Sequence, residues 1–194
     1  MAPPVIADDI VRRAQRGDTA AFAAIVSAFQ TPIFNYILRA VGDRGLAEDL
    51  TQDVFLRVYQ SLPRFSFRSK LATWLFQVAK NRVVDEFRNR ERRPQGAELQ
   101  VDSVRVADPP VERMETIDAI WRAIRELPLD LRTALLLRDV SGFSYVEIAE
   151  ILGATLATVK WRIYQARELV AQSAAAEGLV EARESRPRAL TSVA

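Results

Sequence analysis

The chain has 194 residues, of which 49% are apolar and 27% are charged, and its formal net charge is +2. It contains neither cysteine nor histidine, which excludes disulfides and thiolate metal sites and removes the commonest general base. We therefore expect no metal and no cofactor, and an enzyme is disfavoured but not excluded, because carboxylate chemistry needs neither residue. Because we find no run of eighteen apolar residues and no secretory signal, we also expect a cytoplasmic protein without membrane insertion.

The apolar periodicity predicts an all-α fold. Near the N-terminus, apolar residues recur at spacings of three and four, as they do on one face of a helix. After a break at 42–45 ("GDRG"), further helices are expected over 46–62 and 71–93, the second of which stops before Pro94. The stretch between these two helices, "RFSFRSK", has the turn-forming serines of a loop.

The character of the sequence changes over 94–112. This stretch contains three prolines, has little periodicity and carries a net charge of −3, so we interpret it as a flexible acidic linker. It joins two small helical domains at 8–93 and 113–170, and the tail at 171–194 is expected to be partly disordered. Charge is distributed unevenly, because 64–93 holds nine basic residues against three acidic ones.

The strongest local pattern is a helix-turn-helix within 145–164. Ala149, Gly153 and Val159 stand where this motif needs a small residue, a residue that tolerates positive φ, and an inward anchor. Thr155 is placed to cap the second helix. The buried face is expected to hold Ile148, Ile151, Leu152, Val159, Ile163 and Ala166. The side chains left outside would enter a DNA major groove, and they are Thr158, Lys160, Trp161, Arg162 and Gln165. The alternative is an ordinary three-helix core with a polar face.

Two further patterns lie in the first domain. Aromatic and basic residues are interleaved over 65–93, a mixture that suits single-stranded nucleic acid because bases stack on aromatic faces while Lys and Arg contact phosphates. Phe76 and Phe87 are better explained as core residues, whereas Trp74 fits either role. The helix over 46–62 places Asp49, Gln52, Asp53 and Leu56 on one face. Such an acidic and amide patch is, by itself, usually only solvated.

Taken in chain order, the helix with the acidic and amide patch, the aromatic and basic segment, and the helix-turn-helix resemble the bacterial RNA polymerase sigma factors of the small extracytoplasmic-function (ECF) type, group IV of the sigma-70 family. The resemblance is carried by "AEDLTQDVFLRVYQSLPRF", "KLATWLFQVAKNRVVDEFR" and "LPLDLRTALLLRDVSGFSYVEIAEILGATLATVKWRIYQAREL", and it covers residues 8–170. It implies a non-enzymatic protein that binds core polymerase and directs it to promoters. It also implies control by an anti-sigma factor, which is often tethered to the membrane and would then hold the protein at the inner membrane face.

The resemblance further implies sites. In the domain that is similar to sigma region 2, the 49–56 patch would dock on the β′ clamp helices of the polymerase, and the following loop would hold a base flipped from the −10 element. The implied −10 contacts are Phe67, Arg68, Lys70, Trp74, Lys80, Asn81 and Arg88. In the domain that is similar to region 4, the second helix would read the −35 element, and the first turns would touch the β flap. The implied −35 contacts are Thr155, Thr158, Lys160, Trp161, Arg162, Gln165 and Arg167.

Two residues depart from the family pattern. Gln165 stands where relatives often have a phosphate-binding arginine, and Trp161 stands where they usually have a small residue, often serine. On a helical wheel, Trp161 points about 160° away from the core side. We therefore expect it on the surface that meets the −35 major groove.

Two other classes of protein stay open. An operator-binding repressor or activator would need dimerisation and palindromic half-sites, and it would leave the 49–56 patch without a role. A carboxylate-metal nuclease would rely on Asp49 with Asp53 or on Asp85 with Glu86. The absence of histidine and the apolar stripes around these acids disfavour a nuclease.

Overall fold

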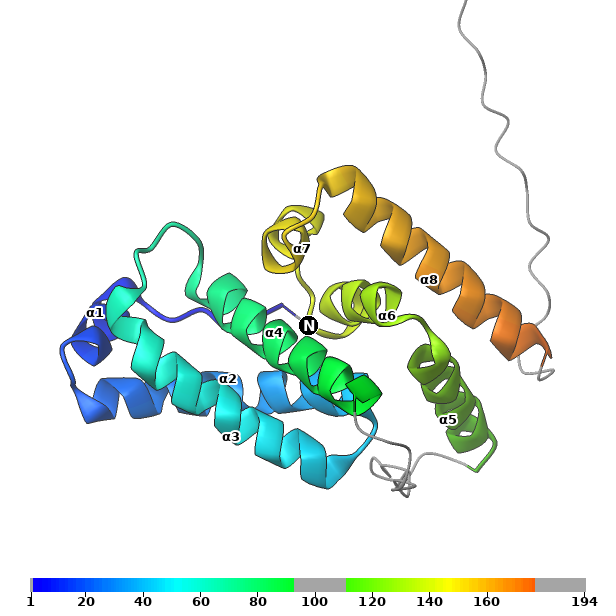
Figure 1. Cartoon of the computed structure of the whole chain (residues 1–194), viewed down its shortest axis with the longest axis horizontal. Coiled ribbons are helices and arrows are strands. Elements are labelled where there is room, and N and C mark those ends of the chain that lie inside the picture. The colour runs from blue at the N-terminus through cyan, green and yellow to red at the C-terminus, as the bar shows by residue number, and fades with distance from the viewer. Residues whose placement is uncertain (1, 93–110, 177–194) are drawn as a thin grey trace, which may run out of the picture.

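The computed structural model describes residues 2–92 and 111–176, and over these ranges the chain is all α, as the sequence predicted (Figure 1). Side chains are described up to Arg92 and again from Ile117. The elements in chain order are α1 (Asp8–Gln15), α2 (Thr19–Val41), α3 (Arg44–Ser61), the 3₁₀ turn η1 (Leu62–Arg64), α4 (Leu71–Arg92), α5 (Val111–Glu126), α6 (Leu129–Leu135), the π-helical turn η2 (Leu136–Val140), α7 (Tyr145–Leu152) and α8 (Leu156–Ala176).

The break predicted at 42–45 is a tight junction between α2 and α3. Gly42 ends α2 with φ of 77°, a left-handed conformation that glycine adopts without a steric penalty. Asp43 then caps α3, because its carboxylate accepts a hydrogen bond of 2.7 Å from the backbone N–H of Leu46. One glycine and one aspartate are therefore enough to reverse the chain.

Helix α2 lies at the centre of the first half of the molecule. The apolar residues that precede and follow Pro32 belong to one helix, which continues through this proline. It is long and apolar enough, with a mean hydropathy of 1.4, to meet the criteria for a membrane span. However, Ile25, Phe29 and Ile33 have no exposed surface, and α2 contacts α1, α3 and α4. Its apolar residues thus form the core of a helical bundle.

The second half of the chain contains α5 to α8. Helix α5 begins at Val111, so its first residues fall inside the segment predicted as linker, and 93–110 lies outside the described residues. Helix α8 runs on to Ala176, beyond the boundary predicted at 170, and the tail from 177 onward is also outside the described residues. Both predicted boundaries therefore fall within helices.

The two halves pack against each other, which the sequence analysis did not predict. Helix α4 contacts α7 (Figure 1). Helix α2 contacts both α5 and η2. Phe143, just before α7, has no exposed surface, and its ring lies 4.8 Å from that of Phe76 in α4. Buried residues of both halves consequently belong to one continuous hydrophobic core.

Candidate nucleic-acid interface

The loop between η1 and α4 is built around three aromatic rings that contact one another at tilted angles. Phe65 is buried, and its ring centroid lies 5.0 Å from those of both Phe67 and Trp74. Phe67 has φ of 58°, and it is the one non-glycine residue with positive φ among those described. A backbone in this region costs about 1–3 kcal/mol and persists only where its surroundings hold it. Such strain is typical of functional loops.

Helix α1 supplies the contacts that hold this loop. The Arg12 guanidinium lies 4.4 Å over the Phe67 ring, as in a cation–π contact. The Gln15 side chain donates hydrogen bonds to the carbonyls of Leu62 (3.0 Å) and Phe65 (2.7 Å). The sequence analysis missed both residues, since neither lies near the loop in the sequence. Phe67 and Trp74, which it selected, are half-buried in this aromatic cluster.

The basic face of the first half extends from the loop along α4. Arg68, Lys70, Asn81 and Arg88 are exposed, as a nucleic-acid contact requires. Lys80 is half-buried, and burial together with the nearby charge of Arg88 lowers its pKa. Arg68, Lys70, Lys80 and Arg88 therefore supply basic groups in the loop and along α4.

The predicted acidic and amide patch lies on α3. Asp49 and Gln52 are exposed, and Leu56 keeps 60% of its surface accessible, a large value for a leucine. Asp53 differs, because its carboxylate pairs with the Arg82 guanidinium of α4 at 2.9 Å. Tyr59, 55% exposed and one turn beyond Leu56, extends the patch. Its spacing of three from Leu56 was a signal that the sequence analysis overlooked.

The helix-turn-helix is formed as predicted. Gly153 has φ of 62° between α7 and α8, and the Thr155 hydroxyl caps α8 by accepting a 3.1 Å hydrogen bond from the N–H of Thr158. The residues of the predicted inner face that are buried are Ile148, Ile151, Val159, Ile163 and Ala166. Leu152 is half-buried and packs against this core. The motif's turn and core therefore follow from its sequence.

The outer face of α8 carries two exposed aromatic residues. Trp161 is 57% exposed, as expected, and Lys160 beside it is exposed. Tyr164 is 64% exposed on the same helix and was not selected from the sequence. Thr158 and Gln165 are half-buried at the edge of this face.

Two arginines that were selected as −35 contacts are engaged within the protein. Arg162 is 24% exposed, and its guanidinium lies 3.3 Å from the Asp130 carboxylate of α6. Arg167 donates to Asp139 of η2 at 3.0 Å, and this bond raises the pKa of Arg167. Their charges are partly neutralised, so we weight Lys160 and Trp161 above them as DNA contacts.

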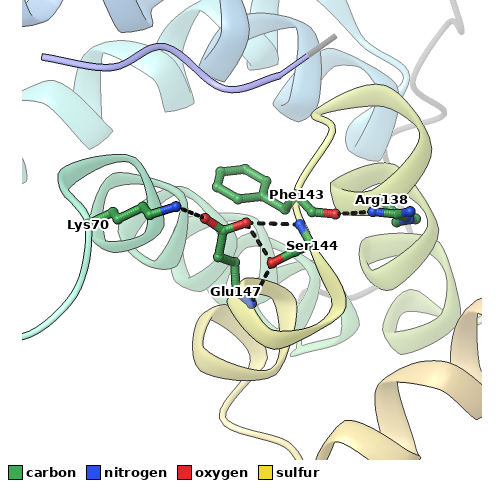
Figure 2. Close-up of polar contacts among 5 residues, drawn as sticks. All are labelled: Lys70, Arg138, Phe143, Ser144 and Glu147. Atoms are coloured by element: carbon green, nitrogen blue, oxygen red, sulfur yellow. Dashed lines mark hydrogen bonds and ion pairs between the residues drawn. The ribbon is translucent and has the colours of Figure 1, made fainter.

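The loop of the first half meets the helix-turn-helix of the second at one polar contact (Figure 2). Lys70 Nζ lies 2.9 Å from Glu147 Oε1. The other carboxylate oxygen of Glu147 accepts hydrogen bonds from Ser144 N (2.9 Å) and Ser144 Oγ (2.7 Å), which completes a capping box at the start of α7. Arg138 donates a 2.8 Å hydrogen bond to the Phe143 carbonyl, which holds the segment just before α7 in place.

Two family models match the chain: "Sigma-70 region 2" over residues 25–93 and "Sigma-70, region 4" over residues 117–170. A helical bundle with a basic aromatic loop, followed by a helix-turn-helix, therefore defines a sigma factor of the sigma-70 family.

Curated relatives narrow the class. The chain is 34% identical to the RNA polymerase sigma-H factor of Pseudomonas aeruginosa, over 83% of this chain and 90% of the relative. It is 32% identical to the ECF RNA polymerase sigma-E factor of Haemophilus influenzae, over 88% and 96%. It is also 32% identical to the ECF sigma factor SigW of Bacillus subtilis, over 81% and 91%. The chain belongs to the ECF sigma factors, which are non-enzymatic initiation factors that bind core RNA polymerase and promoter DNA.

Solved structures share the fold. The chain matches CnrH, solved in complex with the cytosolic domain of CnrY, with a TM-score of 0.68 and 21% identity over 87% of this chain and 96% of that one. It matches the sigma factor RpoE of Bartonella quintana, solved with the anti-sigma factor NepR, with a TM-score of 0.69 and 24% identity over 78% and 95%. These likenesses extend over both halves of the fold.

Proposed function

We propose that this ECF sigma factor docks on the β′ clamp helices of core polymerase through Asp49, Gln52 and Leu56 on α3, with Tyr59 extending the surface. The observation that carries this proposal is the exposure of an apolar leucine and an aromatic ring beside an acidic group on one helix. Exposed apolar residues rimmed by polar ones mark interaction surfaces. Asp53 contributes less, because Arg82 already neutralises it.

The −10 element is read by the aromatic loop and the basic face of α4. Melting a promoter costs about 1.4 kcal/mol for each base step lost, and a sigma factor meets this cost by capturing unstacked bases. Phe67 and Trp74 supply aromatic faces, and stacking on such faces is worth about 1–3 kcal/mol per base. Lys80 and Arg88 support this role as phosphate contacts.

The −35 element is read by the outer face of α8. Lys160 contacts the phosphate backbone, and Trp161 presents an apolar surface that suits thymine methyl groups in the major groove. The first turns of the same half touch the β flap. Two modest DNA contacts on one chain act together because binding of the first raises the effective concentration of the second.

Control by an anti-sigma factor is part of the proposal. It is supported by the structural neighbours CnrH and RpoE, whose structures were solved with CnrY and with the anti-sigma factor NepR. We place the protein in the cytoplasm, where core polymerase and DNA are found. An anti-sigma factor with a membrane anchor would hold it at the inner membrane face.

Binding to core polymerase tests the proposed function. Purified protein is titrated into fluorescently labelled core polymerase, and promoter-length duplex is added afterwards. We expect a complex with core that acquires DNA affinity exceeding that of either component. Tight binding to palindromic duplex without core, together with no binding to core, would instead support an operator-binding regulator.

A further inference from the structure

We infer that the C-terminal segment 177–184 docks into an apolar groove between α2, α5 and α8 and covers it. None of the side chains to which we assign polymerase or DNA contacts lines this groove, so the inference goes beyond the proposed function. The segment lies outside the described residues. Its sequence and the described wall of the groove carry the inference together.

The groove has an apolar wall that the described chain leaves partly open. Its volume is about 720 Å³. Ile120 and Trp121 of α5 and Val170 of α8 line it, and all three are half-buried. Leu136 of η2, which has no exposed surface, also lines it. Apolar surface that is bordered by charged side chains in this way marks a docking surface.

Helix α8 brings the chain to the groove just before the segment begins. Ala174 lines the groove, and the described part of α8 ends two residues later, at Ala176. Three residues of extended chain reach about 10 Å, so Leu179 can return to the wall beside Ala174. A segment tethered this closely has a high effective concentration at the groove, which favours it over a separate partner.

The sequence at 177–180, "EGLV", provides a turn followed by two apolar side chains. Glycine is the usual residue where a helix ends in a left-handed turn, and Gly178 follows Ala176 by two positions. In such a cap the apolar residue after the glycine contacts the residue five positions before it. This pattern pairs Leu179 with Ala174 in the groove. Leu179 and Val180 therefore supply the apolar contacts of the docked segment.

The α2 edge of the groove is cationic. Arg39 lines the groove, and burial together with the neighbouring charge of Arg125 lowers its pKa, whereas Asp118 acts in the opposite direction. At the α8 edge, the Asp139 carboxylate already accepts a 3.0 Å hydrogen bond from Arg167. A further carboxylate beside Arg39 would relieve its repulsion from Arg125.

The charge of the tail is divided in a way that suits this edge. Segment 177–184 contains three glutamates and one arginine, whereas 185–194 contains two arginines and no acidic residue. The acidic part is also the part next to α8. The first half of the tail, rather than the second, is therefore the occupant that the groove fits.

A fluorophore on the segment reports docking through Trp121. The full chain has no cysteine, so Ala182→Cys can be labelled with bimane at one site. Indole quenches bimane when the two are in contact. Because Trp121 lines the groove, the docked segment should show quenched emission. Trp121→Phe, which keeps an aromatic ring beneath Arg39, should restore the emission, and Trp161→Phe on the outer face of α8 should not.

Variants of the tail separate docking from simple proximity to α8. Leu179→Asp combined with Val180→Asp places charges at the docking positions and should abolish the quenching. Leu190→Asp combined with Val193→Asp makes the same change in the second half of the tail, and it should leave the quenching intact. Equal quenching in the two double variants would overturn the inference, as would emission that does not respond to Trp121→Phe.

Other occupants of the groove give different results. The labelled chain that carries Trp121→Phe is mixed with an excess of the unlabelled parent. Quenching that arises in this mixture shows the segment of one copy docked on a second copy, which overturns docking within one chain. If the labelled parent and the mixture are both unquenched, the segment does not dock and the groove is left to a separate partner.

Thermal unfolding of the unlabelled full chains is the second measurement. Docking occurs only in the folded protein, so it stabilises the folded state. The double variant at Leu179 and Val180 should lower the melting temperature, and the matched double variant at Leu190 and Val193 should not. Equal melting temperatures for both variants and the parent would show that the segment makes no contact in the folded state, and the inference would then be wrong.

Discussion

The ring of Phe143 packs edge-on against that of Phe76, with centroids 4.8 Å apart and planes inclined by 68°. Neither side chain has any exposed surface. Phe76 belongs to the half that contains the −10 loop, and Phe143 leads into the helix-turn-helix. This pair therefore joins the two DNA-reading halves through their shared core.

Replacement of Phe143 by alanine should lower the free energy of unfolding by about 3–5 kcal/mol, the usual loss for a buried phenylalanine. It should also make the two halves unfold in separate transitions, because their common core is interrupted. Urea unfolding followed by circular dichroism measures both effects. Phe143→Leu, which keeps most of the volume, should cost clearly less. A loss below 1 kcal/mol for the alanine variant would show that the ring contributes little to the interface.

Asp49→Arg should weaken binding to core polymerase at least tenfold without unfolding the protein. The residue is exposed, and reversal of its charge places a cation in the patch that we propose for the polymerase. Asp53→Arg is a less specific test, because it would also place two guanidinium groups together at Arg82. Titration of labelled core measures the affinity. Glu126→Arg makes the same charge change elsewhere and should leave it unchanged, whereas equal affinity for both variants would refute the α3 site.

Trp161→Ser should change which bases are preferred in the −35 element. A tryptophan that is 57% exposed on the outer face of α8 is not committed to the protein core and is free to contact bases. Selection from a randomised −35 duplex, with the holoenzyme, gives the preferred sequence of each variant. Tyr164→Ser tests whether the neighbouring aromatic contributes. If Trp161→Ser alters affinity equally for every sequence, Trp161 does not read bases.

Lys160 and Arg162 should differ in how they affect the salt dependence of −35 binding. Lys160 is exposed, so Lys160→Ala should reduce the slope of log affinity against log salt by about 1. Arg162 is paired with Asp130 and is 24% exposed. Arg162→Ala should mainly lower stability, by about 1 kcal/mol or less. Equal changes in slope for both variants would place Arg162 on the DNA after all.

The sequence predicted the local structure well because its signals are local. A glycine with positive φ, a capping threonine and a run of apolar spacings fix the turn and the inner face at Gly153, Thr155 and Val159. The junction at Gly42 and Asp43 was predictable for the same reason. Such signals act within a few residues and need no knowledge of the rest of the fold.

The contacts between the halves were not predictable in this way. Phe143 and Arg132 are, in sequence, an ordinary apolar and an ordinary basic residue of the second domain. Only tertiary packing places Arg132 beneath the Ala40 carbonyl, and only tertiary packing commits Arg162 to Asp130. Family resemblance also selects side chains by position, so it cannot tell a free arginine from one that a neighbouring helix already neutralises.

Run-off transcription with core polymerase on genomic DNA, read by mapping of 5′ ends, tests the central claim most directly. The protein should create new start sites that share one −35 and one −10 sequence, and Asp49→Arg should abolish them. If the 5′ ends are the same as those made by core polymerase alone, the chain does not direct initiation and the sigma-factor account is wrong.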